Sequence, residues 1–127
     1  MQLSTSPIRI VAVDLDRTLL DDNRQLSERN HSALHRCVEN SVHIAVCSGR
    51  DLPATRAITS AWDFPCWLVV QNGSLVLDPN GVPIDIRKLT REQAGRVLDV
   101  LERHDLPPVV YDVHPDSHRV WWKRGSQ

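Results

Sequence analysis

The sequence predicts an α/β fold, a parallel β-sheet with helices on both faces. Three short, mostly apolar segments (residues 8–13, 42–47 and 67–70) alternate with two segments in which apolar residues recur at helical spacing. The apolar segments lack strict alternation, which is typical of strands buried on both faces. A β-α-β-α-β order of this kind favours parallel strands joined by right-handed crossovers.

Both helices of this alternation begin at a recognisable signal. Ser27 is a suitable N-cap for a helix that extends to about Glu39, because its hydroxyl can accept a hydrogen bond from the first turn. Asp51 is the corresponding residue for a helix over residues 52–62. Pro53 fits the first turn of that helix, where its missing N–H costs little.

The second half of the chain changes character. Residues 74–77 and 82–86 flank Asp78-Pro79-Asn80-Gly81, a turn sequence that predicts a hairpin. Thr90 has the spacing of a capping box with Gln93 and predicts a helix that ends near His104. Residues 109–113 and 119–123 predict two more strands.

Composition and charge limit the classes of partner. The chain has 127 residues, 15 of them basic and 16 acidic, and a formal net charge of −1. This balance gives no electrostatic reason to expect nucleic acid or an anionic membrane as a partner. No apolar run approaches the ~20 residues that span a bilayer, and the first residues do not resemble a signal peptide. Three cysteines without a paired spacing favour free thiols, so we expect a cytoplasmic protein.

Two carboxylates follow the first predicted strand in the pattern Asp14-x-Asp16-x-Thr18. Ligands of open parallel sheets bind beyond the carboxyl ends of the strands. Alternate residues of an extended segment point to one side, so Asp14 and Asp16 can converge. One carboxylate can attack phosphorus while the other transfers the leaving-group proton, and Mg²⁺ is the cation that best offsets their charge. The alternative is a polar loop whose aspartates cap turns.

Two further polar turns follow the second and third predicted strands. Ser48-Gly49-Arg50 combines a hydroxyl, a glycine and a helix N-terminus, which are the parts of a phosphate cradle. Taken alone, it is explained by a plain strand-to-helix turn, and Asn72-Gly73 by a simple β-turn. All three motifs fall just after an apolar strand, so each reaches the same edge of the sheet. Their coincidence favours a single site.

The six histidines do not make a convincing metal site. His31 and His35 are four residues apart on one predicted helix face, a spacing that can bind a metal ion. No third ligand accompanies them, so a solvated helix face is the better interpretation.

Together, these motifs resemble a known family. Residues 11–20, which contain the Asp14-x-Asp16-x-Thr18 pattern, resemble the first motif of the haloacid dehalogenase superfamily of phosphatases, and Ser48-Gly49-Arg50 resembles its second. Residues 21–27 are similar to the flap of the Cof-type subgroup, and residues 71–73 to its third-strand ending. The resemblance covers residues 8–113. It implies a Rossmann-like core, in its N-terminal part, over residues 1–87 and the beginning of a C2-type α/β cap over residues 88–127.

The resemblance also implies roles for the carboxylates. Asp14 matches the nucleophile, which is also a Mg²⁺ ligand. Asp16 matches the general acid/base, whose backbone carbonyl reaches the metal. Thr18 matches a residue that orients the site.

The second and third motifs match phosphate-binding positions. Ser48 corresponds to the phosphate-binding hydroxyl, with Gly49 and Arg50 beside it, and Asn72 lies near the phosphate. The implied activity is Mg²⁺-dependent hydrolysis of phosphomonoesters of small metabolites. Sugar phosphates are the leading substrate class, and mannosyl-phosphoglycerate or sucrose phosphate are options within the same subgroup.

Two parts of the family's site have no counterpart in the sequence. The family uses a lysine from a third motif and an acidic pair after a glycine from a fourth. Lys88 and Lys123 stand in the wrong context, and no such acidic pair occurs. We therefore expect an N-terminal portion of a phosphatase with an incomplete sheet. The alternative is a non-catalytic remnant that binds a partner or forms a homo-oligomer through its exposed sheet edge and its Trp-rich tail.

Overall fold

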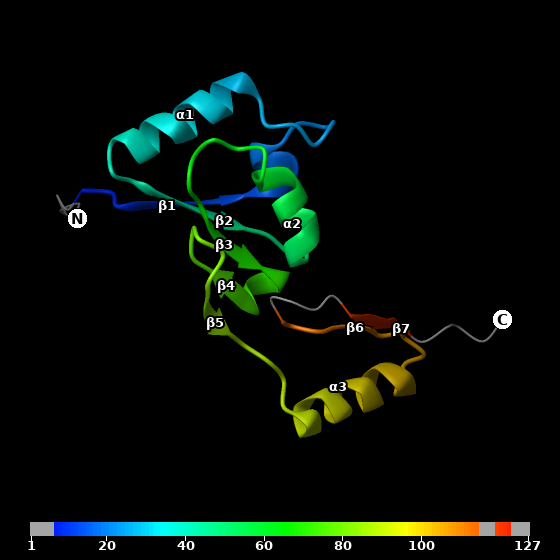
Figure 1. Ribbon diagram of the computed structural model, residues 1–127. Coiled ribbons are helices and arrows are strands. Elements are labelled where there is room, and N and C mark those ends of the chain that lie inside the picture. The colour runs from blue at the N-terminus through cyan, green and yellow to red at the C-terminus, as the bar shows by residue number, and fades with distance from the viewer. Residues whose placement is uncertain (1–6, 115–118, 123–127) are drawn as a thin grey trace, which may run out of the picture.

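A computed structural model describes residues 7–114 and 119–122 (Figure 1). The first part of the chain contains β1 (Ile10–Asp14), α1 (Glu28–Glu39), β2 (His43–Cys47), α2 (Leu52–Thr59), β3 (Trp67–Val70), β4 (Leu75–Leu77) and β5 (Pro83–Ile86). The second part contains α3 (Arg91–Arg103), β6 (Val109–Tyr111) and β7 (Val120–Trp122). Every predicted element therefore exists, although Lys123, the expected end of the last strand, lies outside the described residues.

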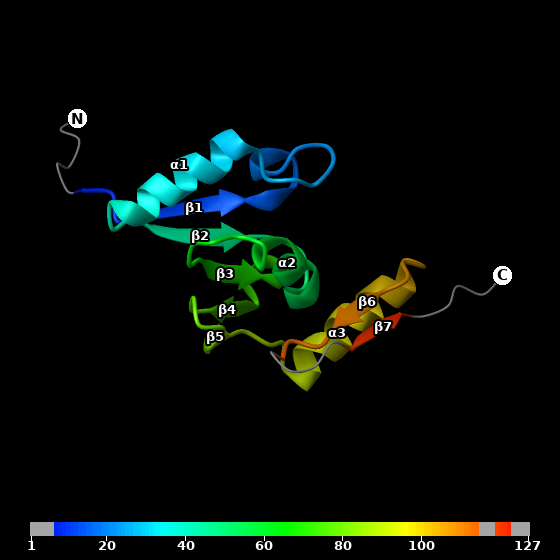
Figure 2. The same cartoon turned by 45° about the horizontal axis from the view of Figure 1, so that its top comes forward.

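The main sheet has five strands in the order β1-β2-β3-β4-β5 (Figure 2). The first three run parallel, and β4 and β5 add an antiparallel hairpin. The predicted turn closes that hairpin: the carboxylate of Asp78 accepts bonds from the backbone N–H groups of Asn80 and Val82, and Gly81 has a φ of +82°. The α/β class is confirmed, with a mixed rather than an all-parallel sheet.

The helix starts follow the predicted capping chemistry. Ser27 Oγ accepts from Asn30 N, and Asp51 Oδ1 accepts from Ala54 N. Thr90 and Gln93 form both bonds of a capping box. These interactions lie within a few residues of each other in the sequence, so the sequence alone specifies them.

The predicted end of α2 was three residues too late. The helix stops at Thr59, and Trp62 N then donates to Thr59 O in a turn. The ring of Trp62 packs against that of Phe64, with centroids 5.3 Å apart. Packing between aromatic rings outside the helix replaces the last helical turn.

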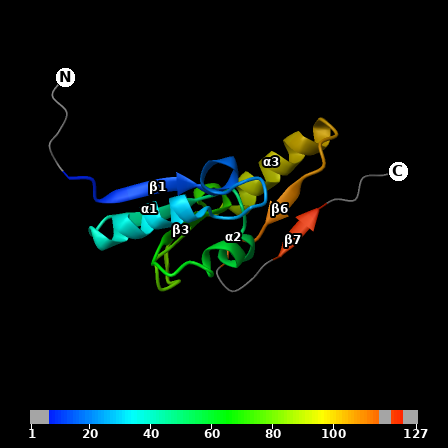
Figure 3. The same cartoon turned by 90° about the horizontal axis from the view of Figure 1, so that it is seen from above.

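Both helices of the main sheet lie on the same face, as Figure 3 shows from above. Apolar residues of α1 and α2 join one buried cluster with a single face of the strands, made of Val11, Val13, Ile44, Val46, Leu68, Val70, Leu75 and Leu77. On the opposite face, Ile10 is 55% exposed. The described helices α1 and α2 thus cover one face, and the β1 residues on the opposite face are exposed, in contrast to the predicted cover on both sides. The strand β1 is an edge of the sheet, with its residues alternating between exposed and half-buried.

Helix α3 and the strands β6 and β7 form a second unit. The two strands pair antiparallel, and no residue of α3 is buried. One contact to the first unit is a 3.4 Å hydrogen bond from Gln71 Nε2 to the carbonyl of Asp112, and Val113 packs against the main core beside it. No helix in the described part of the chain is long and apolar enough to cross a membrane.

Candidate functional site

The three polar turns meet at the carboxyl ends of β1, β2 and β3. Ser48 N donates to the carbonyl of Val69, and Asn72 N donates to the carbonyl of Ser48. Gln71 N donates to the carbonyl of Arg50. These bonds join the second and third turns, and the register of β1 with β2 places Asp14 opposite Cys47. The predicted meeting of the turns at one edge is present.

Asp14 is held by the turn that follows it. Residues Leu15–Leu19 form a wide turn, η1, in which the buried side chains of Leu15 and Leu19 anchor the ends. Thr18 Oγ1 donates to Asp14 Oδ2 over 3.1 Å. The two buried leucines therefore fix the ends of the turn and leave the three polar residues between them, Asp16 to Thr18, exposed.

Asp16 is bound by Arg50 from the neighbouring turn. Arg50 Nε donates to Asp16 Oδ2 at 2.7 Å, and a terminal guanidinium nitrogen donates to Oδ1 at 2.6 Å. This hydrogen-bonded guanidinium holds the pKa of the Asp16 carboxyl below its usual value of 3.8 and raises the pKa of Arg50. The sequence predicted that Asp14 and Asp16 converge and that Arg50 binds phosphate. In the structure, each carboxylate has a different partner, and Arg50 binds Asp16.

A shallow pocket of about 350 Å³ opens beside Asp14, lined by residues that include Ser48, Gly49 and Asn72. Ser48 is buried, and its Oγ accepts from the backbone N–H of Arg50. A Cβ at Gly49 would lie 3.0 Å from Asn72 Oδ1, so a larger residue would displace the asparagine. Asn72 has a φ of +55°, a conformation that asparagine tolerates better than most residues. These positions have local steric reasons for their residue types.

Sequence reasoning missed Cys47 as a wall of this pocket. Its thiol lies beside Asp14, and burial together with the charge of Asp14 raises its pKa. Its position in the sequence could have pointed to it, because Cys47 is the last residue of β2 and pairs with Asp14, the last residue of β1. Both effects disfavour the thiolate form of Cys47.

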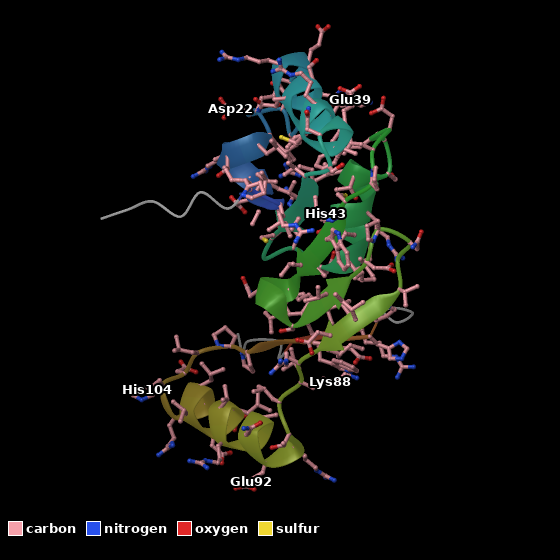
Figure 4. The ribbon with its side chains drawn as sticks, turned by 90° about the vertical axis from the view of Figure 1, so that its left-hand side faces the viewer. Asp22, Glu39, His43, Lys88, Glu92 and His104 are labelled. Carbon is pink, nitrogen blue, oxygen red and sulfur yellow. The ribbon has the colours of Figure 1, made fainter. Side chains whose placement is uncertain are left out.

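A larger cavity of about 690 Å³ separates the sheet from the second unit. Gly49 and Asn72 line it as well as the small pocket, and α3 contributes apolar residues such as Leu98 and Leu101. Gln71 also lines it, and the buried Oε1 of Gln71 has no hydrogen-bond partner among the described residues. Figure 4 shows Lys88, another lining residue, between the sheet and α3. The two cavities thus adjoin at Gly49 and Asn72, and the larger one has room for a small organic group.

In residues 7–114 and 119–122, no group of three or more histidine, cysteine, aspartate or glutamate side chains is placed so that it could hold a metal ion. His31 Nε2 lies 2.9 Å from an oxygen of Asp63, and the His31 ring packs against Phe64. His31 therefore ties α1 to the loop before β3, where the sequence predicted only a solvated helix face.

The family comparison is decisive. The model of the haloacid dehalogenase-like hydrolase family matches residues 11–122. This chain belongs to that family. The sequence resemblance is thus confirmed, and the turns described above are where the family's first two motifs were expected.

Individual relatives of this haloacid dehalogenase-like chain are phosphatases by name. It is 26% identical over 98 residues to the 5-amino-6-(5-phospho-D-ribitylamino)uracil phosphatase YcsE of Bacillus subtilis, a match covering 77% of this chain and 39% of the relative. It is 32% identical over 90 residues to the HMP-PP phosphatase of Cronobacter sakazakii, covering 71% of this chain and 33% of the relative. The chain therefore spans between a third and two fifths of the length of these two relatives.

Solved structures agree on the fold. A haloacid dehalogenase-like hydrolase from Bacillus subtilis matches with a TM-score of 0.73 and 25% identity, over 83% of this chain and 37% of that one. A phosphatase of the haloalkanoate enzyme superfamily from Bacteroides thetaiotaomicron matches with a TM-score of 0.77 and 16% identity, over 99% of this chain and 45% of that one. The second match extends the shared fold to nearly the whole chain.

Proposed function

We propose that this chain carries the nucleophile half of a phosphatase site that acts on phosphomonoesters of small metabolites. The observation that supports this most is Asp14, oriented by Thr18 and opening onto the pocket lined by Ser48, Gly49 and Asn72. We assign residues 1–87 to the N-terminal part of a core domain and residues 88–127 to the start of a cap. The large cavity between them is where the organic part of the substrate lies.

Hydrolysis proceeds in two balanced steps. An oxygen of the Asp14 carboxylate bonds to phosphorus as the bond from phosphorus to the leaving oxygen breaks, and Asp16, which is protonated in the substrate complex, gives that oxygen its proton. A water then attacks the phosphorus of the aspartyl-phosphate, and Asp16 takes the water's proton. Asp14 is regenerated, and inorganic phosphate leaves. The hydroxyl of Ser48 and the side chain of Asn72 orient the phosphoryl oxygens.

The donors at this site suit magnesium. Mg²⁺ prefers hard oxygen ligands, and it commonly takes one or two carboxylates with water and phosphate completing its shell. Asp14 supplies a carboxylate next to the pocket, and Asp16 supplies a backbone carbonyl in the following turn. Bound there, the ion would offset the negative charge of the phosphoryl group.

Sugar phosphates are the first substrates to test. One relative is named for a substrate with a phosphate on a ribityl chain, and another for a small phosphorylated compound. Phosphate release from a panel of sugar phosphates, with Mg²⁺, checks the class. Asp14→Asn should reduce release to the level without protein, whereas Asp22→Asn, in the neighbouring flap, should leave it unchanged. Equal release by all three proteins would contradict the proposed function.

A second candidate function rests on the free edge of the sheet. The strand β1 has no partner on its outer side among the described residues, and Ile10 on it is 55% exposed. An unpaired apolar edge can add a strand from another chain. We propose dimerisation through β1 as the alternative. Ile10→Lys should then shift the sedimentation of a dimer to that of a monomer, while Ile84→Lys, at the opposite edge and 56% exposed, should not.

A further inference from the structure

The ion pair of Arg50 with Asp16 joins two loops that the proposed chemistry uses separately. Both guanidinium bonds are short, and the pair spans 34 residues of sequence. A fork of two parallel N–H donors fits a carboxylate, and the same fork fits a phosphate group. The guanidinium is thus already arranged for a phosphate while a carboxylate occupies it.

The two partners differ in how firmly they are held. The side chain of Arg50 is only 22% exposed, and its backbone is bonded on both sides, to Ser48 Oγ through N and to Gln71 N through O. Asp16 is 49% exposed and lies in the η1 turn beside Arg17, whose φ is +59°. Asp16 is therefore the partner that moves if the pair separates.

The place of Arg50 in the site suggests what would separate the pair. Arg50 directly follows Ser48 and Gly49, which line the pocket beside Asp14. A phosphate there carries a charge of about −1.5 to −2 at neutral pH, more than the single charge of a carboxylate. A phosphate bound beside these residues would compete with Asp16 for the donors of Arg50.

We propose that Arg50 is a positioning residue that exchanges Asp16 for a phosphate oxygen when phosphate enters the site. This inference rests on the proposed function. Without ligand, Arg50 holds the Asp16 carboxylate away from Asp14. With phosphate bound, the Arg50 guanidinium stays in place and donates to the phosphate, and Asp16 moves away to face the leaving oxygen. The alternative is a permanent ion pair that links the two loops and does not separate when phosphate binds.

The two models differ in one prediction. If phosphate displaces Asp16 from Arg50, removing Asp16 should strengthen phosphate binding, whereas a permanent ion pair predicts no such gain. The probe is inorganic phosphate, titrated calorimetrically at fixed ionic strength into the wild type, Asp16→Asn, Asp16→Ala and Arg50→Gln. Both Asp16 variants should bind about two- to fivefold more tightly, the factor that corresponds to losing a competing exposed pair of about 0.4–1 kcal/mol. Arg50→Gln should bind more weakly than the wild type.

A double-mutant cycle assigns the gain to Arg50. Asp16→Asn should add little in the Arg50→Gln background, because the freed guanidinium is gone. Asp22→Asn removes one negative charge from the neighbouring flap and is the matched control, expected to leave phosphate affinity near that of the wild type. An equal gain from Asp22→Asn, or an equal gain in both backgrounds, would overturn the exchange.

The failures of the two proposals can be told apart. Phosphate binding that is the same in the wild type and both Asp16 variants refutes the exchange and leaves the proposed function standing. No phosphate binding by any of these proteins refutes the proposed function and the exchange with it. In the NMR spectrum, the Arg50 Nε–H resonance should move on adding phosphate to the wild type, and it should already be shifted in Asp16→Ala.

Discussion

The main sheet with α1 and α2 contains the buried apolar core, whereas no described side chain of α3, β6 or β7 is buried. Every fully buried apolar side chain among the described residues lies between positions 15 and 77. Helix α3 has a capping box and an apolar face, yet none of its residues is buried, and Val97 is 48% exposed. A two-stranded sheet is too small to cover a helix face. A helical pattern thus predicts a helix, but burial depends on what lies opposite.

Truncating matched leucines in the two regions should give the largest difference. Leu77 is fully buried in the main sheet, so Leu77→Ala should lower the free energy of unfolding by about 2–5 kcal/mol. Leu98 on α3 is only half-buried, and Leu98→Ala should cost less than about 1 kcal/mol. Urea unfolding followed by circular dichroism measures both. Equal losses would mean that the second unit is packed as firmly as the first.

Removing a helix cap should also affect the two regions differently, with smaller changes in stability than the leucine truncations. Each cap contributes about 1 kcal/mol, so Asp51→Ala should lower the stability of the whole main sheet by about that amount. Thr90→Ala should instead reduce hydrogen-exchange protection in α3 alone. Loss of protection in β2 or β3 on Thr90→Ala would show that the two regions unfold together.

The smallest expected effect is the loss of stability at low pH that comes from the ion pair of Arg50 with Asp16. Because the folded pKa of Asp16 is lowered, its contribution to stability is complete above the ordinary value of 3.8 and is lost as the pH falls through the folded pKa. The wild type should therefore lose more stability than Asp16→Asn between about pH 5 and about pH 3, by less than about 1 kcal/mol. Arg50→Gln should flatten the profile in the same way. The measurement is the urea midpoint of unfolding at each pH. If the midpoints of the wild type and both variants change identically with pH, the ion pair contributes nothing measurable to stability.

Local interactions were predictable from the sequence, and long-range ones were not. The caps at Ser27, Asp51 and Thr90 involve neighbours three residues away, and a turn after an apolar strand marks the edge of the sheet where Asp14 lies. The bond between Asp16 and Arg50 depends on how two loops pack, and opposite charge alone does not select that pair.

The sequence also failed to predict that one face of β1 is exposed. Its composition is that of a strand covered on both faces, but composition does not say whether the covering residues are present. The helices α1 and α2 cover one face, and the sequence pattern of each helix is the same whichever face it covers. The choice of face is therefore a property of the assembled sheet.

The most direct test of the central claim is to trap the aspartyl-phosphate. The chain is incubated with p-nitrophenyl phosphate and Mg²⁺ and reduced with borohydride, which converts a phosphorylated aspartate to homoserine, and the peptides are sequenced by mass spectrometry. If Asp14 is the nucleophile, homoserine appears at position 14 in the wild type and at no position in Asp14→Asn. Homoserine at another position, or none in the wild type under conditions in which phosphate is released, would contradict that role.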